Sequence, residues 1–426
     1  MQFKQYPSYK NSGVEWLGDV PEHWQIVRTK DIFNHRKEEA LEDDEIVTAF
    51  RDGQVTLRKN RRTDGFTNSI KEHGYQHINN GDLVIHEMDA FAGAIGVSDS
   101  SGKSTPVYTV CYAKNENINH HFYSHFFRTM AKTGFINSLA KGIRVRSTEF
   151  RWNESRNVYL AEPPKADQEK IVSFLDTETA RIDNLIAKQE KLIELLEEQR
   201  KSIISHAVTK GLNPNAPMKD SGVEWLGEVP EDWEVKRFGY IFTENKKKNI
   251  GLIETNVLSL SYGNIKEKNI DDNKGLLPES FETYQIIEPN DIVFRFTDLQ
   301  NDKRSLRNAI SKYHGIITSA YIGVKTKENA DFYNYLFRAY DLQKVFYSMG
   351  DGMRQSLKMD ELNKMPIVLP KIEAQERIVK FINEENQRIN NLVVKQKNLI
   401  EKLKEYRASI ISHAVTGKID VREFGA

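Results

Sequence analysis

The sequence has little that would support a secreted fold or a membrane protein. Its single cysteine, Cys111, excludes a disulfide framework and a cluster of thiolate metal ligands. No apolar run is long enough to cross a bilayer and no signal peptide is visible, so we expect the chain in the cytoplasm. Its 61 basic and 61 acidic residues cancel, so the net charge does not indicate a nucleic-acid ligand. Locally segregated charge can still form a binding surface.

Catalytic motifs are also missing. There is no GxxxxGK[ST] phosphate loop, no glycine-rich dinucleotide turn, no HExxH, and no Asn/Asp-Pro-Pro-aromatic tetrapeptide of the amino-methyltransferase kind. His120, His121 and His125 share a helix face, but no carboxylate or further ligand stands close to them, which favours structural or surface histidines. His206 and His413 have heptad spacing and are interpreted as polar seam residues. We therefore expect a non-catalytic chain with no metal and no cofactor of its own.

The chain contains a long internal repeat. Residues 167–209 and 374–416 match without a gap, at an offset of 207, and both copies end in SIISHAVT. Neither copy contains an internal proline or glycine, and both are rich in Leu, Ile, Glu, Lys and Gln, which favours a long helix. Some forty helical residues would form a rod of roughly 60 Å. The chain's 426 residues suffice for two or three domains.

Apolar residues in both copies alternate steps of three and four, the spacing of a coiled-coil seam. The nearest available partner for each helix is the other copy, and the polar Gln189 and Gln396 can fix the register. The predicted seam residues are Ile182, Leu185, Gln189, Leu192, Leu196, Gln199 and Ile203 in the first copy, and Ile389, Leu392, Gln396, Leu399, Leu403, Tyr406 and Ile410 in the second.

A second repeat opens each half. Residues 10–24 return as residues 219–233, and their Gly, Pro and Trp content predicts a turn-rich packing segment that is not a regular element. Its tryptophans, Trp16, Trp24, Trp225 and Trp233, are expected to anchor it in a core. We predict a first globule with its leader over 1–162, a first long helix over 163–212, a second globule with its leader over 213–369, and a second long helix with the C-terminal tail over 370–426.

The globules themselves diverge in sequence, and residues 25–160 and 234–368 share only a skeleton. Short β-type runs alternate with turns in both. The predicted fold class is α+β, with two small α/β globules, each with a curved or mixed sheet, alternating with two long helices that pair as an antiparallel coiled coil. Strands are expected at 82–86, 107–112, 291–296 and 316–324, and helices at 118–132 and 331–348.

Basic clusters recur in both globules. Arg and Lys neutralise phosphates, and Arg also binds guanine edges with two hydrogen bonds. A single cluster favours a solvated face, but recurrence in two divergent globules indicates DNA. The repeated Gly-x-Arg pairs, Gly142/Arg144 and Gly352/Arg354, fit a structural turn as well as a DNA contact. The predicted DNA-binding residues are Arg58, Lys59, Arg61, Arg62, Lys141, Arg144, Arg146, Lys246, Lys247, Lys248, Lys303, Arg304, Arg307, Arg354 and Lys358.

This arrangement resembles the specificity (S) subunit of type I restriction–modification systems, the HsdS family. The resemblance lies in SGVEWLGxVPxxW at the start of each half, in the Pro-x-x-x-x-Gln-x-x-Ile approach to each helix at 163–171 and 370–378, and in the alternation of divergent globules with nearly identical helices. It covers nearly the full chain, although the globules match only in outline.

The resemblance implies a target-recognition domain in each globule, which reads one half of a bipartite, asymmetric site in double-stranded DNA, with the helices as a spacer. It also implies docking of two methyltransferase subunits that carry S-adenosylmethionine, and of two restriction subunits that use ATP. Two alternatives remain: a coiled-coil scaffold that organises partner proteins without base-specific DNA binding, and a self-sufficient enzyme, which the missing motifs disfavour.

Overall fold

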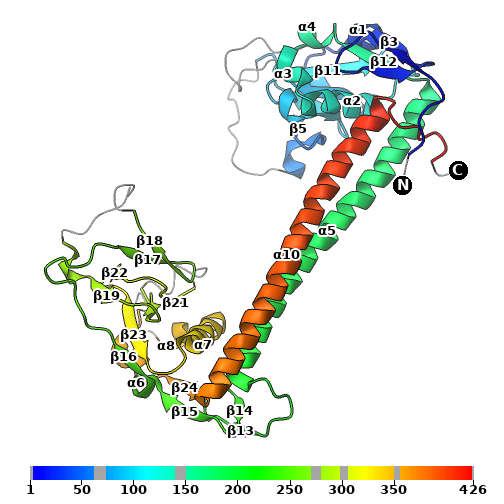
Figure 1. Cartoon of the computed structure of the whole chain (residues 1–426). Helices are drawn as coiled ribbons and strands as arrows, with labels where there is room; N and C mark the ends of the chain where they lie inside the picture. Colours follow the sequence, from blue (N-terminus) through cyan, green and yellow to red (C-terminus); the bar gives the residue numbers. More distant parts are fainter. Residues whose placement is uncertain are drawn as a thin grey trace. The chain divides into compact units, whose positions relative to one another are not determined.

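A computed structural model describes residues 3–61, 73–139, 150–269, 280–297, 306–349 and 356–424 of the chain (Figure 1). The chain divides into two compact units. The N-terminal unit comprises Met1–Gln189 and Asn398–Ala426, and the central unit comprises Glu190–Lys397. Both boundaries fall inside the long helices, so each unit contains part of both.

The N-terminal unit is built on a four-stranded antiparallel sheet in the order β4-β11-β8-β9. Four further antiparallel pairs, β1-β2, β3-β12, β5-β6 and β7-β10, surround it. The elements are β1 Tyr9–Asn11, β2 Asp19–Pro21, β3 Gln25–Arg28, α1 Thr29–Ile32, β4 Phe33–His35, β5 Val47–Ala49, β6 Val55–Leu57, β7 Gln76–Ile78, β8 Leu83–His86, β9 Ile95–Val97, β10 Gly102–Ser104, β11 Tyr108–Ala113, α2 His120–Lys132, α3 Phe135–Leu139, α4 Trp152–Ser155, β12 Tyr159–Glu162 and α5 Lys165–Lys210, with 3-10 turns at Arg58–Asn60 and Ala90–Ala92.

The central unit repeats this strand order. Its four-stranded antiparallel sheet runs β16-β23-β20-β21, beside the pairs β13-β14, β15-β24, β17-β18 and β19-β22. The elements are β13 Met218–Asp220, β14 Glu228–Pro230, β15 Glu234–Arg237, α6 Phe238–Ile241, β16 Phe242–Glu244, β17 Leu258–Ser261, β18 Asn264–Glu267, β19 Gln285–Ile287, β20 Ile292–Phe294, β21 Asn308–Ile310, β22 Gly315–Ile317, β23 Ile322–Thr326, α7 Ala330–Leu342, α8 Val345–Met349, α9 Met359–Leu362, β24 Pro366–Leu369 and α10 Ile372–Val415, with a 3-10 turn at Phe281–Thr283.

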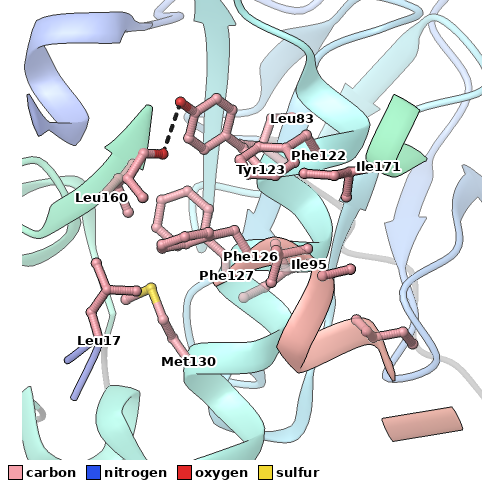
Figure 2. Close-up of a cluster of buried hydrophobic side chains, with 14 of the residues drawn as sticks. Leu17, Leu83, Ile95, Phe122, Tyr123, Phe126, Phe127, Met130, Leu160 and Ile171 are labelled. Carbon is pink, nitrogen blue, oxygen red and sulfur yellow. Dashed lines mark hydrogen bonds between the residues drawn. The ribbon is translucent and has the colours of Figure 1, made fainter. Parts of the chain in front are cut away.

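The predicted helices of the globules are present as α2 and as α7 followed by α8. Asn119 caps α2, because its side chain accepts hydrogen bonds from the amides of His121 and Phe122 at 2.9 and 3.2 Å. The helix buries Phe122, Tyr123 and Phe126 against the sheet (Figure 2). The segment expected as one strand at 316–324 is instead two strands, β22 and β23, because the chain turns between them.

Both predicted long helices are confirmed, as α5 and α10. A buried glutamine at each start ties the helix to its own globule. Gln168 Oε1 accepts the Asn119 amide at 2.9 Å while its Nε2 donates to the Pro163 carbonyl at 2.9 Å. Gln375 forms the equivalent bonds in the central unit: its Oε1 accepts the Asn329 amide at 3.0 Å, and its Nε2 donates to the Pro370 carbonyl at 2.8 Å. Just beyond the helices, Gly211 and Gly417 have φ of 77° and 72°, the left-handed conformation expected at helix ends.

Within each unit the two long helices run antiparallel. In the N-terminal unit, Arg407 of α10 forms two hydrogen bonds to Asp183 of α5, at 2.8 and 3.1 Å. In the central unit, Arg200 donates to Asn390 at 2.7 Å, beside an apolar cluster of Leu196, Ile389 and Val393 together with Ile193, Ile203 and Leu392.

The predicted seam was wrong at alternate positions. Leu192 and Leu399 are 39% and 42% exposed, and Gln199 and Tyr406 are exposed too, while their neighbours Ile193 and Ile400 are partly and fully buried. From Gln189 onward, the more buried residues are four and then three positions apart, whereas the predicted seam has spacings of three and then four. Two apolar residues are adjacent in sequence at several of these positions, as in Leu192-Ile193 and Leu399-Ile400. Either residue could therefore have been assigned to the seam from the sequence. The predictions at Ile182, Leu196, Ile389 and Ile410 coincide with buried residues, and Leu185, Gln189, Ile203, Leu392, Gln396 and Leu403 are partly buried.

Further expectations were wrong in part. The repeated leaders form regular two-stranded pairs, β1-β2 and β13-β14. Trp24 and Trp233 are buried as expected, whereas Trp16 and Trp225 are only partly so. His206 and His413 are exposed and do not lie in the seam.

The C-terminal tail completes the core of the N-terminal unit. Ile419 and Val421 are buried there. The Phe174 ring packs against Phe3 and Phe424, with ring centroids 5.5 and 4.9 Å apart, respectively. The two ends of the chain therefore belong to one unit. In the described part of the chain, no helix has the length and apolarity needed to span a bilayer.

Candidate nucleic-acid interface

Three arginines surround a hollow of about 630 Å³ beside the β5-β6 hairpin of the N-terminal unit. Arg51 lies in the hairpin turn, and Arg58 and Arg61 follow β6 on a 3-10 turn. Thr48, His86 and Tyr108 also line it, together with the carboxylates of Asp52 and Asp89. Two residues predicted from sequence, Arg58 and Arg61, thus lie at one concave and cationic surface.

Two of the three arginines of this hollow, Arg51 and Arg61, form ion pairs with carboxylates near the surface. Arg61 pairs with Asp52 at 2.7 Å and lies over the Phe50 ring at 4.3 Å. Arg51 pairs with Asp89 at 2.9 Å, and Lys59, outside the hollow, pairs with Glu45. Exposed pairs of this kind contribute about 0–1 kcal/mol, so a phosphate can replace the carboxylate at little cost.

A helix arginine positions each hairpin. In the N-terminal unit the Arg128 guanidinium of α2 packs against Gly53 in the β5-β6 turn so closely that a Cβ there would lie 2.3 Å from Nη1. In the central unit Arg338 of α7 donates to the carbonyl of Gly263, in the β17-β18 turn. The two hairpins therefore rest on equivalent supports while their turn residues differ.

The predicted lysine cluster of the central unit is exposed. Lys246, Lys247 and Lys248 follow β16. Lys246 lies 3.4 Å from Glu244 and Lys247 lies 4.0 Å from Glu288. Lys325 also contacts Glu288, at 2.6 Å, and this hydrogen bond lowers the pKa of the Glu288 carboxyl. The cluster presents solvated cations suited to phosphate contacts, without a fixed geometry for reading bases.

Arg307 was wrongly predicted as a DNA contact. The residue is 0% exposed; its Nη1 donates to the Thr297 carbonyl at 3.2 Å, and the guanidinium lies 5.7 Å from the centre of the Tyr347 ring. Its amide also donates to Asp341 at 3.0 Å. A fully buried guanidinium cannot meet a DNA phosphate, so Arg307 has a structural role.

The remaining predicted contacts have different fates. Lys358 is exposed at the start of α9, where its amide donates to Glu361 at 2.7 Å. Seven residues lie outside the described ranges: Arg62, Lys141, Arg144, Arg146, Lys303, Arg304 and Arg354.

Exposed aromatic and aliphatic side chains were missed from sequence. Tyr262 stands at the tip of the β17-β18 hairpin, 71% exposed and with φ of 47°, and Tyr240 is 81% exposed. Ile250 and Ile253 are also exposed, in the segment after the lysine cluster. Side chains of this kind stack on bases or wedge between them. The two-residue turn Tyr262-Gly263 between alternating runs was the available signal.

The predicted structural role of the histidines has direct support at His120, whose Nε2 accepts the Ala113 amide at 3.0 Å. Burial lowers the pKa of this imidazole. Among the described residues, no group of three or more His, Cys, Asp or Glu side chains is arranged to hold a metal ion.

Comparisons with known proteins agree with this architecture. Residues 21–195 match the model of the type I restriction modification DNA specificity domain. The chain is 22% identical to the putative type I restriction enzyme MjaX specificity subunit of Methanocaldococcus jannaschii, over 99% of both chains. It is 23% identical to the MjaVIII specificity subunit of the same organism, over 95% of this chain and 94% of the relative.

Two solved structures share the fold. A chain from a study of complex assembly and conformational transition of the type I R-M system matches with a TM-score of 0.62 and 14% identity, over 93% of this chain and 98% of the other. The HsdS subunit from Thermoanaerobacter tengcongensis matches with a TM-score of 0.55 and 14% identity, over 94% and 98%.

Proposed function

We infer that this chain, which belongs to the family of type I restriction–modification specificity subunits, supplies the DNA-sequence specificity of such a complex. One observation carries the inference: the same buried contacts, such as those of Gln168 and Gln375, hold two globules whose exposed hairpins differ. A shared frame with divergent surfaces suits two readers of unlike sequences. This role would place the chain in the cytoplasm, together with the chromosomal DNA.

We propose that each globule reads one half of a bipartite, asymmetric site in double-stranded DNA. In the N-terminal unit the arginine-lined hollow beside β5-β6 supports this, because Arg combines phosphate binding with readout of guanine edges. In the central unit the exposed lysines supply phosphate contacts, and the tyrosine at the tip of β17-β18 supplies a ring for a base.

We propose that α5 and α10 form an antiparallel coiled coil that sets the distance between the half-sites. The antiparallel contacts within each unit support this proposal, as does the four-three spacing of the buried residues. A continuous helix of 46 residues is about 69 Å long. Because one base pair adds about 3.4 Å, a helix pair of fixed length selects a fixed gap.

We propose that two methyltransferase subunits dock on the helices and bring S-adenosylmethionine, that two restriction subunits bring ATP hydrolysis, and that this chain performs no catalysis. Leu192 and Leu399 support two docking faces, since they occupy equivalent positions (399 − 192 = 207) and both are exposed. Exposed apolar residues at matched positions indicate surfaces that a partner covers.

Co-purification with a cognate methyltransferase, followed by long-read mapping of methylated adenines, tests the function. We expect one interrupted sequence motif to be methylated by the complex and none by either protein alone. A stable complex that never methylates or binds a defined sequence would instead indicate a scaffold. Methylation by the isolated chain would indicate an enzyme.

A further inference from the structure

A hollow of about 240 Å³ lies in the N-terminal unit where α2 packs beside the last turns of α10. The α2 wall carries His125, Arg128 and Lys132, on three successive turns of one helix face. This hollow is separate from the arginine-lined hollow beside β5-β6, with which it shares no lining residue.

The α10 wall supplies hydroxyls and a second imidazole. Ser409, Ser412 and His413 line it, and Ser409 Oγ lies 3.3 Å from His413 Nδ1. Each serine hydroxyl can rotate to donate a hydrogen bond, and the imidazole can donate through Nε2. The two walls together offer cations on one side and neutral donors on the other.

The positive charge of this hollow is not balanced by its own lining. Among the described residues that line it, none is acidic. Burial lowers the pKa values of Arg128 and Lys132, and the neighbouring cation Arg407 lowers both further, while the nearby Asp52 carboxylate partly offsets this for Arg128. Arg407 is itself bound to Asp183, so that carboxylate is already engaged. Like charges crowded in a partly buried site favour an anion between them.

Two nitrogen atoms at the hollow also lack hydrogen bonds. Arg128 Nε and His125 Nδ1 are buried and have no hydrogen-bond partner in the described part of the chain. Burial and the adjacent Arg128 lower the pKa of His125 to about 3, so the ring is neutral and Nδ1 can donate in one tautomer. Buried polar atoms are nearly always paired, so unpaired nitrogens in two residues that line one hollow favour a ligand there.

The central unit shows that the common frame does not require this cluster. At the equivalent positions of α7, 210 residues later, Tyr335 replaces His125 and Leu342 replaces Lys132. The Tyr335 hydroxyl donates to Asn383 at 2.8 Å, and Gln343 donates to Ser205 at 3.3 Å. There Tyr335 and Gln343 have hydrogen-bond partners, whereas the N-terminal unit keeps a cationic hollow. The unpaired Nε is common to both units, because Arg338 Nε, like Arg128 Nε, has no hydrogen-bond partner in the described part of the chain.

We propose that this hollow binds a phosphate-type oxyanion, with Arg128 and Lys132 supplying charge and the Ser409 and Ser412 hydroxyls and His413 supplying hydrogen bonds. Guanidinium and ammonium groups are the usual phosphate ligands, and charge-assisted hydrogen bonds are shorter and stronger than neutral ones. Either a free phosphate or a phosphate of a DNA backbone could supply this group.

Titration calorimetry of the full-length chain with inorganic phosphate, at constant ionic strength kept with chloride, tests the proposal. We expect one saturable site in the wild-type chain and at least tenfold weaker binding in Lys132→Leu, a change that the chain itself carries at Leu342. His413→Gln, at an exposed residue, should weaken binding about threefold by loss of one neutral donor. Lys380→Leu, an exposed lysine elsewhere on α10, is the matched control and should bind like the wild type.

Absence of saturable binding to the wild type, or equal affinity in the wild type, Lys132→Leu and Lys380→Leu, would overturn the proposal. A thermal melt without phosphate shows whether each variant folds. If Lys132→Leu does not fold, the affinity of His413→Gln for phosphate decides the test. Repeating the titration with duplex DNA present identifies the source of the group. Competition assigns the site to a backbone phosphate, and unchanged binding assigns it to a free anion; both outcomes support the oxyanion site.

Discussion

Single residues show how far local sequence indicates a site. The clusters around Lys247 and Arg61 were predicted from charge alone, and both residues are exposed to solvent. Arg307 belongs to an equally basic stretch but is buried by Tyr347 and Asp341, which lie 40 and 34 residues further along the chain. The charge of a short stretch can be read directly from the sequence. The burial of a residue depends on residues distant in sequence, so it cannot be read in the same way.

The buried glutamines give a first prediction. Gln168→Ala would leave the Asn119 amide and the Pro163 carbonyl without their partner, so we expect a loss of about 2 kcal/mol in the free energy of unfolding. Urea denaturation measures it. Gln199→Ala, at an exposed position of the same helix, should change stability by less than about 0.5 kcal/mol. Equal effects of the two changes would contradict the anchoring role of Gln168.

The lysine cluster gives a second prediction. Lys247→Gln should weaken binding to all DNA sequences alike and reduce the slope of log affinity against log salt by about one, as expected for one phosphate contact. Binding of the assembled complex, measured at several salt concentrations, tests this with Lys380→Gln as the control. A loss confined to the cognate sequence would show that Lys247 reads a base.

At the scale of elements, both long helices, several strands of the two sheets and the helices of the globules were predictable, because period and composition are local signals. The seam was not fully predictable. Leu192 and Ile193 are both apolar, so the sequence permits either step, and packing against the other helix decides between them. Pairing of strands distant in sequence, such as β3 with β12, also left no local signal.

Mutations on the two faces of α5 in the central unit should have different effects on stability and on partner binding. Leu196 is buried against Ile389 and Val393, so Leu196→Ala should cost about 2–3 kcal/mol of unfolding free energy, measured in urea. Leu192→Ala should cost less than about 1 kcal/mol because its side chain is exposed. Leu192→Lys should nevertheless reduce co-purification of the methyltransferase. A Leu192 variant that destabilises the helix pair but still co-purifies with the methyltransferase would contradict the assignment of Leu192 to the docking face.

The hairpin turns give a further prediction. Gly53→Ala would place a methyl group against the Arg128 guanidinium in a backbone with φ of 94°, so the β5-β6 turn must shift. We expect methylation in vitro to lose preference at one half-site only.

Gly81→Ala is the matched control for Gly53→Ala, because its φ of 93° imposes the same backbone strain, and no atom of the described residues lies within 4 Å of the added methyl group. It should lose about 1–2 kcal/mol of stability and keep the sequence preference. Equal loss of preference in both variants would show that backbone strain, and not the hairpin support, is responsible.

At the scale of the whole molecule, the duplicated leaders and helices indicated two globules and a resemblance to type I specificity subunits from the sequence alone. They did not indicate that the C-terminal tail packs in the N-terminal unit. Ile419, Val421 and Phe424 lie almost the whole chain length from Phe3, and no local pattern encodes such a contact. The phosphate-type site was missed for the same reason, because its walls come from α2 and α10.

The most direct test of the account exchanges residues 25–160 for those of another family member and maps the methylated adenines of the resulting complex. Independent globules on a common frame predict that one half-site changes while the other half-site and the gap remain. A change in both half-sites, or in neither, would contradict the central claim that each globule reads its own half of the target.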